Sequence, residues 1–116
     1  MDKLRKSKNK ALLRERQKLL QELSSLSILI RGSMFQRFST CSRPNCVCRN
    51  GKRHGPRTYV AITLKNVQKQ YYVQKEQVKV VRDSIKQHHR LLKIAERITV
   101  INLELMRKGV LDEQDN

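Results

Sequence analysis

Two stretches of the chain repeat apolar residues with the period of an α-helix. The first covers residues 3–31, where strong helix formers fill the positions between the apolar ones. Its apolar positions step by three, four or seven residues: Leu12, Leu19, Leu23, Leu26 and Ile30. Gly32 and Ser33 then break the pattern. We therefore predict an N-terminal helix over residues 1–31, with a polar first part.

The second helical stretch covers residues 76–108. Its apolar stripe steps by three or four throughout: Val78, Val81, Ile85, His88, Leu92, Ala95, Ile98, Ile101 and Leu105. Gly109 follows two basic residues, which is typical of a helix C-terminus. His88 lies on the stripe and is expected to be a packed seam residue. Asn102 lies beside the stripe and would fix the helix register if it faces a partner helix.

The segment between the helices has the pattern of a β-hairpin. Residues 58–64 alternate and are rich in β-branched side chains, residues 70–74 form a shorter run, and residues 65–68 supply the turn. Residues 34–40 also alternate and predict a third strand.

These elements give a mainly α fold with a small β element. The expected segments are an N-terminal helix (1–31), a basic head with a metal loop and hairpin (32–75), a C-terminal helix (76–109) and an acidic tail (110–116). The two long helices either form an antiparallel hairpin within the chain or pair between subunits as a coiled coil. Further apolar residues lie off the main stripes: Leu13, Leu20, Ile28, Leu29, Leu91, Ile94, Val100, Leu103 and Met106. They favour a homo-oligomer or docking on a larger protein.

All three cysteines of the chain fall within eight residues, at Cys41, Cys46 and Cys48, and His54 follows six residues later. Three thiolates and one imidazole complete the tetrahedral shell of a structural zinc ion. Turn-forming residues between them allow the chain to wrap a small ion. The alternative for His54 is that it is exposed, with water or an outside ligand as the fourth donor.

Other roles for the cysteines fit less well. Their number is odd, no secretory signal precedes them, and a Cys46–Cys48 disulfide across one residue would be strained. A catalytic cysteine needs one thiol beside a base rather than three clustered thiols.

The distribution of charge along the chain is more informative than its total of +16. Between Glu22 and Glu76 there is no acidic residue, and this interval holds ten basic ones. An acid-free, arginine-rich interval beside a metal loop is typical of proteins that bind a polyanion, most commonly nucleic acid. The residues expected to contact it are Arg37, Arg43, Arg49, Lys52, Arg53, Arg57, Lys65 and Lys69.

The order of Arg31-Gly32-Ser33-Met34, Arg37, the three cysteines and His54-Gly55-Pro56 resembles a family of short bacterial and archaeal proteins known only as a domain of unknown function. The resemblance covers about residues 31–105. It implies that Cys41, Cys46, Cys48 and His54 are the family's metal ligands. The resemblance also implies a mobile-element setting, and this setting favours DNA as the ligand.

We therefore expect a zinc-stabilised, basic protein that binds nucleic acid mainly through phosphates. The alternative is a non-catalytic helical adaptor that docks on a larger nucleic-acid-processing complex. We expect no enzyme and no small-molecule substrate, since no paired carboxylates or glycine-rich phosphate loop occur and four protein ligands would saturate the zinc. No apolar signal or membrane span is evident, so a reducing cytoplasmic location is expected.

Overall fold

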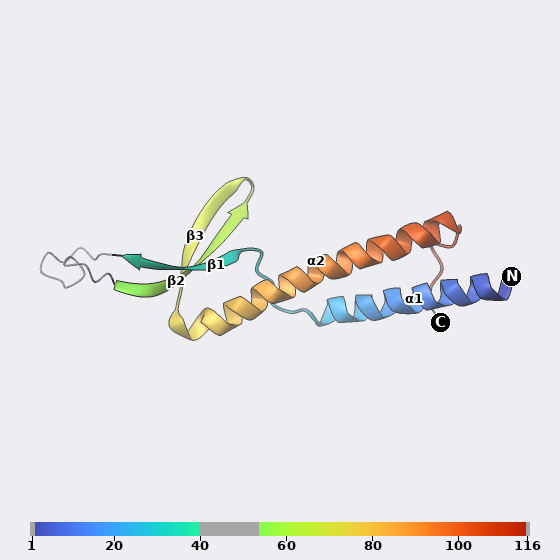
Figure 1. Ribbon diagram of the computed structural model, residues 1–116, viewed down its shortest axis with the longest axis horizontal. Helices are drawn as coiled ribbons and strands as arrows, with labels where there is room; N and C mark the ends of the chain where they lie inside the picture. Colours follow the sequence, from blue (N-terminus) through green and yellow to red (C-terminus); the bar gives the residue numbers. More distant parts are fainter. Residues whose placement is uncertain (1, 40–53, 116) are drawn as a thin grey trace, which may run out of the picture. The chain divides into compact units, whose positions relative to one another are not determined.

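A computed structural model describes residues 2–39 and 54–115 of the chain (Figure 1). In chain order, the elements of these residues are α1 (Asp2–Ser25), β1 (Ser33–Ser39), β2 (His54–Leu64), β3 (Val67–Val73), the short 3-10 helix η2 (Lys75–Gln77) and α2 (Val78–Arg107). No helix in the described residues is long and apolar enough to cross a membrane.

The chain divides into two compact units. The helical unit consists of Met1–Leu29 and Gln87–Asn116, and the sheet unit of Ile30–Lys86. The helix α2 contributes its first residues to the sheet unit and the remainder to the helical unit. The prediction of two helices with a β element between them is confirmed. The third strand predicted over residues 34–40 is present as β1, so the sheet has three antiparallel strands.

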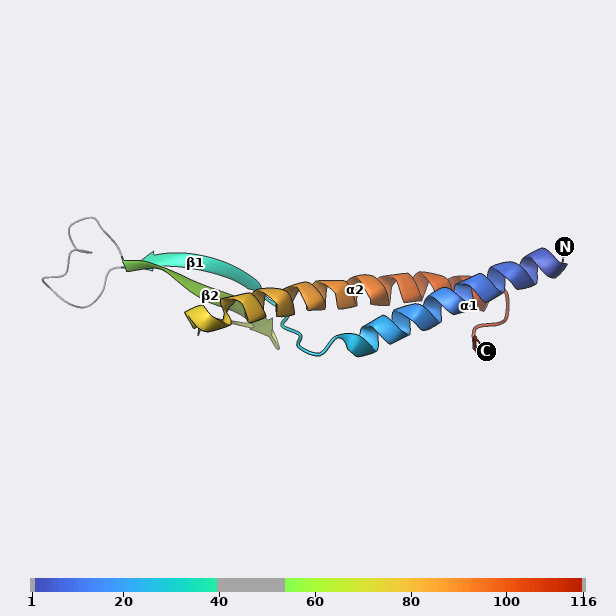
Figure 2. The same ribbon diagram turned by 90° about the horizontal axis from the view of Figure 1, so that it is seen from below.

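In the helical unit, α1 runs antiparallel to the C-terminal part of α2, so the helices pair within one chain (Figures 1 and 2). Glu22 pairs with Arg90 and Glu15 pairs with Arg97, so rising numbers on α1 meet falling numbers on α2. Their core consists of Leu13, Ile101 and Leu105, with Leu12, Leu19 and Val110 packed around it.

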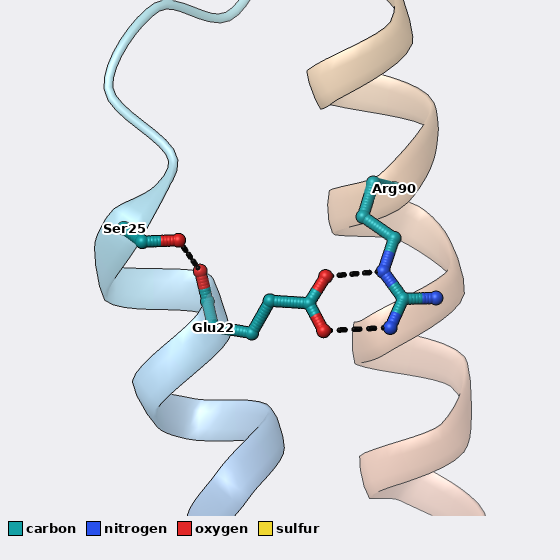
Figure 3. A network of polar contacts seen from close by, with 3 residues as sticks. All are labelled: Glu22, Ser25 and Arg90. Atoms are coloured by element: carbon teal, nitrogen blue, oxygen red, sulfur yellow. Dashed lines mark hydrogen bonds and ion pairs between the residues drawn. The ribbon is translucent and has the colours of Figure 1, made fainter.

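Each of these two ion pairs is a two-pronged contact. The Glu15 carboxylate accepts bonds from Arg97 Nε at 2.6 Å and Nη2 at 2.9 Å. Glu22 accepts from both Nε and Nη2 of Arg90 (Figure 3). The pairs lie seven residues apart on each helix, so they repeat the same contact two turns along and favour one register.

The helix α1 ends at Ser25, not at Arg31 as the sequence predicted. Ser24 and Ser25 are weaker helix formers than the residues before them. The Ser24 hydroxyl donates to Gln21 O at 2.7 Å. The Ser25 hydroxyl donates to Glu22 O at 2.6 Å (Figure 3), so two carbonyls near the helix end have side-chain partners. The chain then extends, and Ile30 N–H donates to Ser84 O at 3.2 Å.

The predicted stripe of α2 is correct at both ends and wrong in the middle. Leu92 was expected in the core but is 53% exposed, whereas Ile94, placed off the stripe, is 1% exposed. Leu13 of α1 was also placed off the stripe and is buried. Several series of three- and four-residue steps run along these helices, and only the position of the partner helix decides which one is buried.

The end of α2 agrees with the sequence. Gly109 has φ 73, and its N–H donates to Met106 O while Val110 N–H donates to Leu105 O, both at 3.0 Å. This is a Schellman motif, and Val110 packs against the core that contains Leu105.

In the sheet unit, the strands are ordered β1-β2-β3, and every pair is antiparallel. A two-residue turn at Lys65 and Asn66, with φ of 51 and 65, joins β2 to β3. Such a turn matches the twist of a hairpin. One face of the sheet packs on the start of α2 through a core of Val60, Val73 and Ile85, with Ile30, Met34, Ile62, Val78 and Val81 around it.

Gly32 lies directly before β1, where the chain passes close to β2. A Cβ at this position would lie 2.7 Å from Ala61 O and 3.2 Å from Val60 Cγ2. A glycine is therefore needed where the chain enters the sheet close to β2.

Candidate nucleic-acid interface

The strand register separates the side chains of the sheet into two faces. Val60 and Val73 point toward α2, so residues of opposite parity point away from it. We call the face away from α2 the open face. By register it carries Ser33, Phe35, Arg37, Arg57, Tyr59, Ala61, Thr63, Gln68, Gln70 and Tyr72.

A row of three aromatic side chains crosses the open face. Phe35 of β1 is paired with Tyr59 of β2, and Tyr59 is paired with Tyr72 of β3. The Phe35 and Tyr59 rings are stacked, with centroids 5.6 Å apart and planes at 18°. Tyr72 meets Tyr59 edge to face at 5.8 Å. We call these three residues the aromatic row.

Arg37 lies over this row. Its guanidinium carbon is 5.5 Å from the centroid of Phe35 and 5.3 Å from that of Tyr59, within cation–π range. Its Nη2 also donates to Gln70 Oε1 at 3.0 Å. The side chain remains exposed, so the contacts hold it against the face while leaving its charge open to solvent.

Arg57 lies directly opposite Arg37 on the neighbouring strand and on the same face. Like charges directly opposite each other destabilise a sheet unless something offsets them. The strands contain no Asp or Glu, and among the described residues the salt bridges all involve helical-unit carboxylates, namely Glu15, Glu22 and Glu104. The Arg37–Arg57 pair is therefore a cationic position without an acidic partner in the described part of the chain.

The structure does not bring Lys65 and Lys69 to this face. Lys65 is in the turn, and Lys69 is paired with Ile62 on the face toward α2. Both line a shallow, mostly apolar groove of about 350 Å³ with Leu64, Val67 and Tyr71. The predicted set of basic residues is thus divided between two faces of the sheet.

The predicted metal ligands can be placed only in part. Cys41, Cys46 and Cys48 lie outside the described residues, as do the predicted contact residues Arg43, Arg49, Lys52 and Arg53. His54 is the first residue of β2, and its backbone is paired with Ser39, the last residue of β1. Within residues 2–39 and 54–115, no three His, Cys, Asp or Glu side chains are grouped as a metal site.

Phe35 and Gln70 are residues of the open face that sequence reasoning did not single out. The alignment of Tyr59 with Tyr72 across β2 and β3 was not predicted either. A two-residue turn at Lys65 and Asn66 fixes that alignment, whereas the predicted turn over residues 65–68 leaves the register undetermined.

The fold and this face define a small basic protein with a helical pair and a three-stranded sheet. A family model described as a domain of unknown function (DUF6788) matches residues 9–83, more than half of the 116-residue chain. The chain belongs to this family, which confirms the resemblance to an uncharacterised family. No curated protein and no solved structure matches the chain.

Proposed function

We propose that this protein is a zinc-stabilised, basic nucleic-acid-binding protein whose contacts are mainly to phosphates. The observation that carries the proposal is the Arg37–Arg57 pair, which presents two cations side by side on an exposed face free of carboxylates. Arginine is suited to forked contacts with phosphate oxygens. The acid-free interval from Glu22 to Glu76 extends the same charge along the chain, and the proposal assigns no catalytic residue.

The metal in this proposal is a structural zinc ion held by Cys41, Cys46, Cys48 and His54. The pairing of Ser39 with His54 supports it, because it places the backbone of His54 beside Ser39, which precedes Cys41 by two residues. Three thiolates and an imidazole are donors that zinc prefers. The ion would fix the segment that carries Arg43, Arg49, Lys52 and Arg53.

Zinc removal provides a direct check of the metal. Chelation should unfold the metal-bound segment while most helical circular dichroism remains, because metal binding is coupled to folding only where the ligands are. Zinc content measured by atomic absorption should be one ion per chain. A Cys46→Ser/Cys48→Ser variant that keeps full zinc content and an unchanged melting curve would contradict this assignment.

A charge-removal experiment tests the phosphate contacts. The Arg37→Gln/Arg57→Gln variant should reduce the slope of log Kd against log salt by about 1.4–1.8, since each phosphate contact contributes about 0.7–0.9. The matched control is Lys18→Gln/Lys93→Gln, which removes the same charge from exposed positions of the helical unit. An equal change of slope in both variants would mean that only total charge matters, and the open face would lose its assigned role.

A second candidate function is a helical adaptor that docks on a larger nucleic-acid-processing complex or on a second copy of the chain. The observation that favours it is a set of large apolar residues left exposed in the helical unit: Leu20, Ile28, Leu29, Leu92, Val100, Leu103 and Met106. Exposed apolar surface of this kind often marks a protein interface. Sedimentation equilibrium of the full chain separates a self-associating protein from a monomer that awaits another partner.

A further inference from the structure

We propose that the open face binds single-stranded nucleic acid by stacking an unpaired base on Tyr72, with Arg37 and Arg57 contacting the adjoining phosphates. This inference rests on the proposed nucleic-acid binding and specifies the class of ligand.

Aromatic residues are concentrated on the open face of the sheet. The chain has two Phe, three Tyr and no Trp, and three of these five residues form the aromatic row. The core of the sheet unit lies on the opposite face and is made of aliphatic side chains. The aromatic row therefore contributes its surface to the open face rather than to the packing against α2.

Tyr72 is more exposed than the other two residues of the aromatic row. A row whose role is limited to cross-strand packing buries its rings against one another. Phe35 and Tyr59 are half-buried in this way, but Tyr72 is 58% exposed. Its edge-to-face contact with Tyr59 holds the ring in place, and a large part of its surface remains available to a planar ligand.

Arg37 and Arg57 lie beside the aromatic row on the same face. Arg37 is held over Phe35 and Tyr59 and bonded to Gln70, so little freedom remains for it to lose on binding. Arg57 precedes Tyr59 by two residues on the same face and is thus a diagonal neighbour of Tyr72. A phosphate chain that passes the two arginines would bring a base to Tyr72.

This combination distinguishes a single strand from a duplex. Paired bases in a duplex are stacked on one another and cannot reach a tyrosine ring, whereas bases of a single strand can be splayed and stacked on aromatic side chains of a sheet. Phosphates are present in both. Removal of an arginine should therefore weaken binding to both ligands, and removal of the Tyr72 ring should weaken binding only to the single strand.

Neighbouring tyrosines supply a matched pair of variants. Tyr71 precedes Tyr72 in β3 but points to the face toward α2, and at 48% it is nearly as exposed. Tyr72→Ala and Tyr71→Ala thus remove the same group from adjacent positions on opposite faces. Tyr72→Phe retains the ring and serves as the conservative variant.

The test is fluorescence anisotropy with the zinc-loaded full chain and labelled oligothymidylate, oligouridylate and a DNA duplex of equal phosphate content, at several salt concentrations. Tyr72→Ala should weaken single-strand binding by roughly 5- to 140-fold, with an unchanged salt slope, while duplex binding is unaffected. Tyr72→Phe and Tyr71→Ala should retain the affinity of the natural sequence. The thymidylate and uridylate arms show whether DNA or RNA is preferred.

Two results would overturn the inference in distinguishable ways. If binding to duplex and single strand depends on salt but Tyr72→Ala weakens neither, the nucleic-acid function stands and the stacking role of Tyr72 is removed. Absence of binding to all three ligands would remove both. Thermal melting of each variant separates a lost contact from a lost fold. If Tyr72→Ala is unfolded, the deciding comparison is the affinity of Tyr72→Phe for duplex and for single strand. A Tyr72→Phe protein that binds the duplex more tightly than the single strand contradicts stacking.

Discussion

At the scale of single residues, Arg16 has the most demanding surroundings of the described chain. Its side chain is only 9% exposed, yet it carries a full charge. The guanidinium donates to Asn102 Oδ1 at 2.9 Å, to Leu111 O at 3.1 Å and to Glu113 O. A buried cation is tolerated only when its donors are satisfied, so Arg16 ties α1 to α2 and to the chain that follows α2.

Removing one partner of Arg16 should be costly because the charge would remain. Asn102→Ala is expected to destabilise the protein by about 1.5–3 kcal/mol, the range for hydrogen bonds to charged groups. Urea unfolding followed by circular dichroism measures it, with Leu103→Ala, an exposed neighbour on the same helix, as the control. Equal stability of the two variants would show that water replaces Asn102 without loss.

At the scale of elements, the ion pairs between α1 and α2 make the helical unit sensitive to acid. The hydrogen bond from Arg97 lowers the pKa of Glu15 below its ordinary value of 4.5, and Arg90 lowers the pKa of Glu22 in the same way. A carboxyl group whose pKa is lower in the folded state stabilises the protein above its unfolded pKa, and this stabilisation is lost as the pH falls through the folded value.

The double variant Glu15→Gln/Glu22→Gln should therefore melt at a lower temperature than the natural sequence near neutral pH. The two melting temperatures should converge as the pH falls below 4.5 and through the lowered pKa values of the two carboxyl groups, because these groups then become protonated. Circular dichroism melts from pH 3 to pH 7 measure this, with exposed Glu96→Gln as the control. A temperature difference that stays constant across this range would rule out the ion pairs as its cause.

The helices and strands could be predicted from the sequence only in part. Helix periodicity, the alternating residues between the helices and Gly109 were sufficient to predict the type and order of the elements. The end of α1 was missed because serine hydroxyls closed the helix early, and Leu92 was misplaced because several helical stripes fit the same spacing. The position of Arg16 depends on residues more than 80 positions away and has no local signal.

At the scale of the whole molecule, the two units carry different features. The helical unit holds the ion pairs and the exposed apolar residues, and the sheet unit holds the aromatic row and the Arg37–Arg57 pair. The basic character of the candidate site was predictable from the acid-free interval. The division of the basic residues between two faces of the sheet was not predictable. Strand register decides the face of every residue, and composition does not determine register.

The most direct test of the central claim is a salt titration of nucleic-acid binding by the zinc-loaded full chain, followed by anisotropy. We expect log Kd to rise with log salt with a slope of at least about 1.4, the value for two phosphate contacts on a single strand. A slope near zero, or no binding at low salt, would contradict the nucleic-acid function and leave the helical unit as the functional surface.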